Sequence, residues 1–462
     1  MDHGSDEAGA IVDRVRNALK RSPRDVSKAA PSVRNLSPSR REGCDFGALP
    51  EFEQLRIQKA AGELLGLENP FYQSHETRAS ATTIIGGESL TNFSSYDYLG
   101  LNGHPEIVKA AKGAIDDLGT SVSASRLTAG EREIHRDLER ALAELHGTED
   151  AISFVSGHAT NVSVIGGLLN QEDLIVTDTL IHNSVIEGAK LSGAKRILCP
   201  HGDMDAFERA LRLNRKRHRR TLIVIEGLYS MDGDTPDLHA LVRFKRRYNA
   251  WLMVDEAHSA GVLGKHGRGV AEEQNVDPRE VDIWMGTLSK AFTSAGGYIA
   301  GSGPLIEVLK YTSPVLVYSV GAPPSSVAAA RVAIEVMARE NWRVKKLRDN
   351  GQYFLQGAKA RGLDTGTSIG ASVIPVIVGS SPMAIVLSQR LRERGFNVVP
   401  IIFPGVAENQ ARLRFFITAA HSFAQIDGVL DAVAAALPEV RSMPSIVSLL
   451  APKAGAEHSD TP

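Results

Sequence analysis

The sequence contains only two cysteines, Cys44 and Cys199, among its 462 residues. Two cysteines cannot supply a disulfide framework, and neither stands in a spacing typical of metal ligands. A small disulfide-rich scaffold and a cysteine-ligated metal protein are therefore excluded, and no metal site is expected. Because nothing in the chain needs an oxidising compartment, the cysteine content favours the cytoplasm.

Long apolar runs and a large net charge are also missing. No run of about 18 apolar residues, the length that a membrane-spanning helix needs, occurs in the chain. The amino terminus, MDHGSDEAGA, is acidic and has no apolar centre, so it does not resemble a signal peptide. The formal net charge of −2 indicates no surface suited to nucleic acid or to a membrane. We expect a soluble protein that binds neither.

The length of the chain predicts two domains with flanking segments. Residues 1–48 contain a short amphipathic stretch followed by a stretch rich in serine, proline and arginine. We expect a helix and a disordered linker there. They form a passive tail, or else they dock a carrier protein or neighbouring module or remain from a fused partner domain. After an amino-terminal segment at 49–90, we place a large domain at 91–330, a small domain at 331–442 and a loose tail at 443–462.

Seven short apolar runs alternate with stretches of helical character in the large domain. Runs rich in valine, isoleucine and leucine that are separated by helices are typical of strands buried on both faces, and hence of a mostly parallel sheet between helices. We expect an α/β fold with a seven-stranded sheet, followed by a smaller α+β domain with a short antiparallel sheet. The seven runs are AISFVS, LIVTDT, RILCP, TLIVIEG, WLMVDEA, VDIWMGTLS and GYIAG.

Polar side chains stand at the ends of three consecutive apolar runs. Asp255 ends WLMVDEA, with His258 one helical turn later, and Ser230 follows TLIVIEG. Thr287 and Lys290 stand at the end of the next run. Because the carboxyl ends of parallel strands meet at one edge of a sheet, we expect these groups to converge in a crevice. Asp255 alone could cap a helix, but the convergence favours a functional site.

Lys290 is the residue that best indicates the chemistry. A surface lysine extends its amine into water, whereas an amine in a partly desolvated pocket has a lowered pKa and can form a Schiff base. Pyridoxal 5'-phosphate requires such an amine together with an acid opposite its ring nitrogen, and Asp255 supplies that acid. The pair predicts a pyridoxal-phosphate enzyme.

The phosphate and the ring of this cofactor need further groups. The segment SGHATN opens a helix after a strand, so the backbone N–H groups of Gly157 and His158 are expected to face the phosphate, aided by the Thr287 hydroxyl. His182 follows the next strand, where its ring can stack on the pyridine. An exposed histidine at a helix start is an equally good interpretation of His182 alone.

Eight blocks between about residue 92 and about residue 421 resemble the α-oxoamine synthase family of fold-type-I pyridoxal-phosphate enzymes. The family includes 8-amino-7-oxononanoate synthase, 2-amino-3-ketobutyrate CoA ligase, 5-aminolevulinate synthase and serine palmitoyltransferase. The resemblance implies a homodimer with the active site at its interface. It also implies a decarboxylative Claisen condensation of an amino acid with an acyl thioester of CoA or of an acyl carrier protein, giving an α-amino ketone. The blocks are NFSSYDYLGLNGHPEI, SASRLTAGEREIHRDLE, SGHATNVSVIGGL, IHNSVIEGAKLSGA, EGLYSMDGDTPDL, VDEAHSAGVLGKHGRG, GTLSKAFTSAGGYIAG and ARLRFFITAAHS.

The resemblance implies roles for individual residues. Lys290 matches the Schiff-base lysine, which can also remove the α-proton, and Asp255 matches the partner of the ring nitrogen. His258 matches a donor to the ring phenolate, Ser230 matches another hydroxyl near that oxygen, and His182 matches the stacking ring.

Two more arginines fall in matching blocks. Arg414 matches the arginine that grips the substrate carboxylate, a role that suits bidentate guanidinium geometry. Arg126 belongs to a block that we expect near the subunit interface.

Two departures from the family pattern involve Tyr96 and the segment KYTSPVLVYSVGAPPSS. Tyr96 stands where synthases of smaller substrates have an asparagine; we expect it to share the substrate carboxylate with Arg414, with aromatic packing as the equal alternative. The segment keeps Ser319 but has Val320 and Gly321 where relatives often carry phosphate-binding hydroxyls. A tyrosine at position 96 is more similar to serine palmitoyltransferase and to synthase domains that accompany polyketide assembly lines, and the segment with Ser319 also resembles those accompanying domains.

Two other functions remain open at this point. A fold-type-I aminotransferase or aldolase would share Lys290 and Asp255 but not the order of the blocks. A catalytically silent subunit could instead bind and regulate a true synthase. The presence of Lys290, Asp255, His258 and Arg414 argues against silence.

Overall fold

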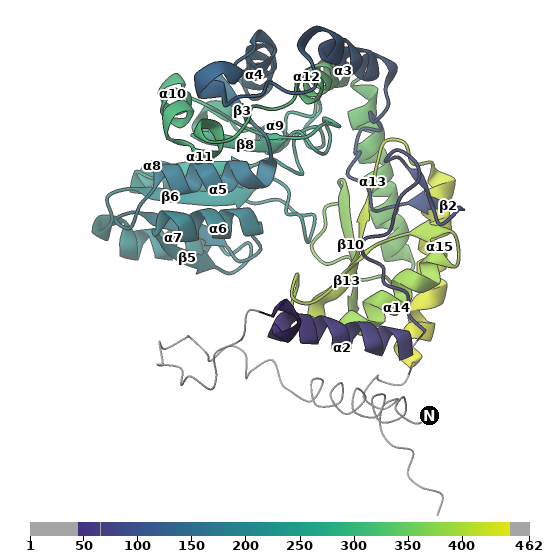
Figure 1. Ribbon diagram of the computed structural model, residues 1–462. Helices are drawn as coiled ribbons and strands as arrows, with labels where there is room; N and C mark the ends of the chain where they lie inside the picture. Colours follow the sequence, from purple (N-terminus) through teal and green to yellow (C-terminus); the bar gives the residue numbers. More distant parts are fainter. Residues whose placement is uncertain (1–44, 65, 444–462) are drawn as a thin grey trace, which may run out of the picture.

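The computed structural model describes residues 45–64 and 66–443 (Figure 1). Residues 1–44 of the helix-and-linker segment expected at 1–48, and all but the first residue of the tail expected at 443–462, lie outside these residues. In the described ranges, no helix has both the length and the apolar character needed to cross a membrane.

A seven-stranded sheet forms the centre of the larger part of the molecule, with the strand order β3-β9-β8-β7-β6-β4-β5. Strand β9 runs antiparallel to both of its neighbours, and the other strands are parallel to one another. Each of the seven apolar runs forms one strand, which confirms the predicted sheet. The strands are β3 Asp150–Phe154, β4 Leu174–Asp178, β5 Lys195–Cys199, β6 Thr221–Glu226, β7 Trp251–Asp255, β8 Ile283–Thr287 and β9 Gly297–Gly301.

Helices cover both faces of this sheet because successive side chains of each strand point to opposite faces. On β6, Ile223 belongs to the same apolar cluster as Phe207 of α7 and Leu241 of α8. Its neighbour Val224 belongs to a second cluster, with Val164 of α5. All six residues of β6 are consequently buried, as expected for a central strand.

The helices are α2 Pro50–Leu64, α3 Pro105–Leu118, α4 Glu133–His146, α5 Gly157–Leu168, α6 Asn183–Ser192, α7 Met204–Asn214, α8 Leu238–Tyr248, α9 Val270–Glu273, α10 Gly303–Thr312, α11 Pro314–Val317, α12 Pro324–Arg339, α13 Trp342–Ala360, α14 Ser381–Arg392 and α15 Phe423–Ser442. Short helical turns add η3 Phe46–Ala48, η4 Arg126–Gly130, η5 Arg215–Arg217, η6 Pro278–Glu280 and η7 Glu408–Gln410.

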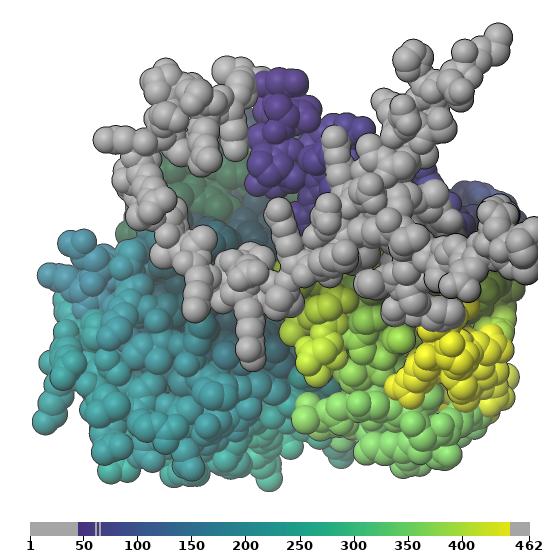
Figure 2. All heavy atoms as spheres, turned by 90° about the horizontal axis from the view of Figure 1, so that it is seen from below, coloured from purple at the N-terminus to yellow at the C-terminus, as the bar shows by residue number. Residues whose placement is uncertain are grey.

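The carboxyl-terminal part contains the predicted short antiparallel sheet, in the order β10-β13-β12. Its strands are β10 Val373–Gly379, β12 Pro400–Ile401 and β13 Ala411–Phe416. Helices α13, α14 and α15 belong to the same part of the molecule (Figure 1). From below, this green-to-yellow part lies beside the teal large-sheet part (Figure 2).

A third sheet was not predicted. Strands β1 Thr82–Ile85 and β2 Glu88–Asn92 form an antiparallel pair, and β2 also pairs in parallel with β11 Phe396–Asn397. The segment before the large sheet therefore joins the carboxyl-terminal part through backbone hydrogen bonds. The domain boundaries at residues 91 and 331 stay predictions.

Candidate active site

Asp255 is the last residue of β7 and is only 4% exposed. The Asn161 side chain of α5 donates a hydrogen bond of 2.8 Å to Asp255 Oδ2, and the Ala257 N–H donates one of 2.9 Å to Oδ1. A buried carboxylate needs such donors, and they hold it in one orientation. Asn161 was not predicted as a site residue, although it lies in the quoted block SGHATN.

Lys290 lies beside this carboxylate, three residues after the end of β8. Desolvation lowers the pKa of its amine to about 8, against the opposing charges of Asp255 and Glu226. The amine is therefore uncharged near neutral pH far more often than that of an ordinary lysine, as a nucleophile or base requires. Its Nζ lies 5.8 Å from the centre of the Tyr96 ring.

Glu226 ends β6 and stands opposite Asp255 in the strand register, yet it was not predicted as a site residue. It is 3% exposed; burial and then the charge of Asp255 raise the pKa of its carboxyl group to about 8. Its Oε2 accepts a hydrogen bond of 2.9 Å from the Ser230 N–H, whereas Oε1 is buried without a partner among the described residues. Glu226 is consequently a mostly neutral acid near neutral pH.

His182 caps the amino terminus of α6, and its Nδ1 forms a hydrogen bond of 2.7 Å with Ser184 Oγ. Ser184 Oγ also accepts a hydrogen bond of 2.9 Å from Asn161, which joins the cap to Asp255. Although His182 is exposed, desolvation lowers its pKa; Asp255 opposes this shift and Lys290 adds to it. The structure confirms that His182 stands at a helix start, and its stacking on the pyridine ring stays a prediction.

His258 is buried, and its Nδ1 forms a hydrogen bond of 2.7 Å with the hydroxyl of Tyr98. Burial keeps the pKa of His258 well below its usual range, so the ring is neutral. The Tyr98 side chain is fully buried and fixes the orientation of this ring. Tyr98 was not predicted, although it lies in the block NFSSYDYLG.

The predicted phosphate site combines the start of α5 with the end of β8. Helix α5 begins at Gly157, and the N–H groups of Gly157 and His158 belong to the first turn, which has no acceptors within the helix. A Cβ atom at Gly157 would lie 3.0 Å from Thr287 Oγ1, so a larger residue would crowd this hydroxyl. Thr287 Oγ1 also donates a hydrogen bond of 3.0 Å to the Gly296 carbonyl.

Arg414 of β13 reaches the loop that follows β6. Its Nη1 donates a hydrogen bond of 2.7 Å to the Ser230 carbonyl, but its Nε is buried without a partner in the described ranges. The guanidinium lies 4.7 Å from the centre of the Phe416 ring. Tyr96, which is 41% exposed, makes an edge-on contact with the same ring at 4.7 Å. The structure thus brings Tyr96 and Arg414 together around Phe416.

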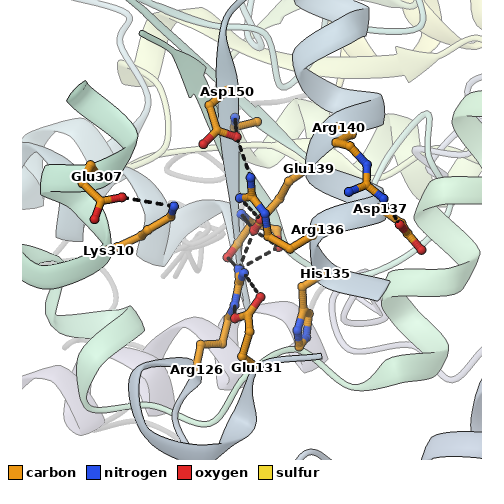
Figure 3. Close-up of polar contacts among 12 residues, drawn as sticks. Arg126, Glu131, His135, Arg136, Asp137, Glu139, Arg140, Asp150, Glu307 and Lys310 are labelled. Carbon is orange, nitrogen blue, oxygen red and sulfur yellow. Dashed lines mark hydrogen bonds and ion pairs between the residues drawn. The ribbon is translucent and has the colours of Figure 1, made fainter. Parts of the chain in front are cut away.

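Arg126 lies in a separate charged cluster (Figure 3). It donates hydrogen bonds of 2.6 Å to Glu131 and 2.5 Å to Glu139, and another to the Ser153 carbonyl. The Gly321 N–H donates a hydrogen bond of 3.1 Å to the carbonyl of Ala124, so the segment containing Ser319 and Val320 adjoins this turn. The location of Arg126 near a subunit interface stays a prediction.

Among the described residues, His104, Glu106 and Glu340 lie close enough together to hold a metal ion. Arg339 pairs with Glu106 at 2.6 Å, and Arg343 pairs with Glu340 at 2.8 Å. These arginines already neutralise both carboxylates, so the group is better described as a surface ion network.

The chain matches the family described as Aminotransferase class I and II over residues 88–433. It is 39% identical over 383 residues to 8-amino-7-oxononanoate synthase of Thermoanaerobacter pseudethanolicus, an alignment that covers 82% of this chain and 94% of the relative. The 8-amino-7-oxononanoate synthase 1 of Bacillus velezensis is 38% identical, with 79% and 93% covered.

Solved structures with the same fold include two enzymes of the kind expected from the sequence. Serine palmitoyltransferase of Sphingomonas wittichii superposes with a TM-score of 0.81 at 30% sequence identity, covering 87% of this chain and 100% of the other. A serine palmitoyltransferase structure with pyridoxal phosphate superposes with a TM-score of 0.81 at 28% identity, covering 86% and 100%.

Proposed function

Because this chain belongs to the α-oxoamine synthase family, within the class I and II aminotransferase group, we propose that the residues around Lys290 condense an amino acid with an acyl thioester. The chain is a pyridoxal-phosphate-dependent acyltransferase of fold type I. The observation that carries the proposal is the convergence of a weakly basic amine, a buried acid and a guanidinium with an unpaired donor, contributed by Lys290, Asp255 and Arg414.

The residues present fit the cofactor. Lys290 would hold its carbonyl carbon, Asp255 its ring nitrogen and His182 one face of its ring. The first turn of α5, with Thr287, would hold its phosphate. When bound, pyridoxal phosphate supplies an electron sink for the negative charge that develops beside the substrate nitrogen.

Asn161 orients the acid that this chemistry needs. Its amide donates to both Asp255 Oδ2 and Ser184 Oγ, so the carboxylate and the loop that carries His182 share one anchor. A carboxylate held in this orientation would favour the protonated form of the ring nitrogen that it faces.

Arg414 binds and orients the carboxylate of the amino acid. Its Nη1 is occupied by the Ser230 carbonyl, which leaves the buried Nε as a free donor for an anionic group. Tyr96 adds a phenolic donor next to it. Two donors restrict rotation of the substrate carboxylate, and this orientation selects which bond at the α-carbon breaks.

Lys290 and His258 handle the protons. The amine of Lys290, with its pKa of about 8, takes the α-proton of the bound amino acid. His258 is neutral and its Nδ1 is engaged by Tyr98, so its Nε2 would be the atom that holds the phenolate oxygen of the cofactor. Ser230 contributes a second hydroxyl near that oxygen.

The finer details follow the family resemblance. We propose a cytoplasmic homodimer with active sites at its interface, in which Arg126 lies near that interface. The solved neighbours are named serine palmitoyltransferase, so the amino-acid panel contains serine together with the two smaller amino acids, glycine and alanine. Acyl-CoA and acyl carrier protein remain the two candidate thioesters.

Release of free thiol from the thioester panel, measured with and without each amino acid, tests the proposal. We expect release only when both substrates are present, with carbon dioxide formed in equal amount. An aminotransferase would instead pass its amino group to a keto acid without releasing thiol. A silent subunit would do neither, and either result would overturn the proposal.

A further inference from the structure

His201 bridges two carboxylates at the edge of the sheet where the candidate site lies. Its Nδ1 lies 3.0 Å from both oxygens of Asp178, and its Nε2 lies 2.8 Å from Asp234 Oδ2. His201 follows β5, Asp178 ends β4, and Asp234 lies in the loop after β6. Because β4 lies between β5 and β6, the imidazole ties together segments that follow three neighbouring strands.

The bridge is charged and largely shielded from water. Burial alone would lower the pKa of His201, but hydrogen bonds and charge from Asp178 and Asp234 overcome this effect and raise it to about 10. The side chains of His201, Asp178 and Asp234 are 19%, 1% and 17% exposed, so little water competes for these bonds. The Tyr229 ring packs edge-on against the imidazole at 4.6 Å.

Asp178 also organises the loop that leads to His182. Its Oδ1 accepts a hydrogen bond of 2.7 Å from the Leu180 N–H, and its Oδ2 accepts one of 3.1 Å from the Gly202 N–H. The direction in which the chain leaves β4 is therefore set by the same carboxylate that holds His201.

Asp234 closes the loop that contacts Arg414. Its carbonyl accepts a hydrogen bond of 2.9 Å from the Tyr229 N–H, and the Tyr229 carbonyl accepts one of 2.8 Å from Gly233. This closed turn presents the Ser230 carbonyl to Arg414 at 2.7 Å. The position of the Arg414 guanidinium thus depends on where the turn is held.

The turn has little freedom on its other side. Gly233 has a φ of 70°, and a Cβ atom there would collide with the Val373 carbonyl of β10. Asp232 forms an ion pair with Arg412 of β13. The turn at 229–234 is packed between the small antiparallel sheet and the His201 bridge. A displacement of the bridge therefore displaces the turn against that sheet.

We propose that His201 is a positioning residue, whose bridge between Asp178 and Asp234 sets the loop that carries His182 at a fixed place relative to the loop that orients Arg414. This inference rests on the proposed function, because it links the loop beside the proposed cofactor ring to the arginine proposed to bind the substrate carboxylate. His201 itself contacts neither group.

His201→Asn breaks the bridge, and Arg219→Gln is its matched control. Arg219 pairs with Asp173 at 3.0 Å, which links the segments before β6 and β4 at the opposite edge of the same sheet. Asp234→Asn is a milder second variant, because it keeps the pair between His201 and Asp178. All three are made in the full-length chain.

Amide hydrogen exchange tests the loops without any substrate. In His201→Asn, we expect exchange in residues 179–182 and 229–234 to become faster by about 10-fold or more, because a charge-assisted hydrogen bond is lost from each side. Arg219→Gln should leave both segments at the wild-type rate. Unchanged exchange in both segments of His201→Asn and Asp234→Asn would overturn the proposal.

Amino-acid binding to the holoenzyme tests the consequence, with glycine, alanine and serine as probes and the cofactor absorbance as signal. We expect the Kd of the bound amino acid to rise about 10- to 100-fold in His201→Asn, because a small displacement of a binding group has effects of this size. Asp234→Asn should show a smaller rise, and Arg219→Gln none.

The two measurements separate the two hypotheses. If wild-type holoenzyme responds to no amino acid while the loops of His201→Asn exchange faster, the proposed function fails and the role of His201 in loop placement stands. If the wild type binds an amino acid and His201→Asn binds it equally well, the positioning proposal fails and the proposed function stands.

Discussion

Two clusters of buried charge in this protein differ in how completely their groups are paired. Around Arg126, the guanidinium groups and carboxylates all have partners: Glu139 is fully buried but contacts both Arg126 and Arg136, and Arg136 also reaches Asp150 (Figure 3). Around Lys290, Arg414 Nε and Glu226 Oε1 are buried without partners in the described part of the chain.

The difference indicates which cluster holds the fold and which is prepared for a ligand. In a fully paired network, ion pairs and hydrogen bonds offset the desolvation cost of the buried charges, so the network stabilises one arrangement. Unpaired buried groups and strongly shifted pKa values, such as those of Lys290 and Glu226, destabilise the free protein and gather at functional sites.

The largest effect on activity is expected from Lys290→Ala. Removal of the amine that we propose takes the α-proton should lower thiol release by about 10³-fold, while the cofactor still binds. The control is Lys310→Ala, which removes a lysine paired with Glu307 and should retain full activity (Figure 3). Near-native turnover, or a cofactor trapped by borohydride on another lysine, would contradict the assignment.

The largest effect on stability is expected from Glu139→Gln. This change leaves Arg126 without a full counter-charge in a buried place, so the free energy of unfolding should fall by about 3–5 kcal/mol in urea titrations. Glu226→Gln should cause no such loss, because glutamine keeps an acceptor for the Ser230 N–H and removes the cost of keeping a buried acid protonated. Equal losses of unfolding free energy in both variants would show that the two clusters do not differ in their contribution to stability.

A smaller effect is expected on amino-acid binding. Arg414→Ala should weaken it by about 10- to 150-fold, which corresponds to one charge-assisted hydrogen bond. Tyr96→Phe should weaken it only modestly but should release carbon dioxide in the absence of the thioester, because one restraint on the carboxylate is gone. If Tyr96→Phe matches the wild type in both measurements, Tyr96 serves only to pack against Phe416.

A further effect is expected on the pH dependence of stability in the protein without cofactor. Between pH 4.5 and about 8, folded Glu226 keeps a proton that the unfolded chain releases, because its pKa rises from 4.5 to about 8 on folding. The unfolded state then binds fewer protons, so stability falls as the pH rises through this range. Glu226→Gln should lack this component, and urea titrations at intervals across the range would measure the difference. Parallel curves for the two proteins would refute the assignment.

The sequence predicted the large sheet and the convergence of Lys290, Asp255 and Ser230, because burial patterns are local and the ends of parallel strands share one edge. Arg414 lies on another sheet and was expected only from the family resemblance. It did not predict the pairing of β2 with β11, in which Asn92 contacts Asn397 across 305 residues. Backbone pairing over such a distance leaves no periodic signal in either segment.

Other site residues were visible in the sequence but not recognisable there. Asn161, Tyr98 and Glu226 lie inside quoted blocks, yet their roles depend on hydrogen bonds to groups on other elements. His201 lies outside every block, and only the placement of β4 between β5 and β6 brings it to Asp178 and Asp234.

From the sequence alone, the order of apolar runs and the residues at their ends indicated the fold class and the cofactor, and the resemblance of the eight blocks indicated the reaction family. The tertiary structure alone decided the charge states of those residues. Desolvation sums over all surrounding atoms, and elements distant in the chain supply those around Lys290 and Glu226. The ends of β8 and β6 bring the Lys290 amine and the Glu226 carboxyl group to one edge of the sheet. Burial there lowers the pKa of Lys290 and raises the pKa of Glu226, each to about 8.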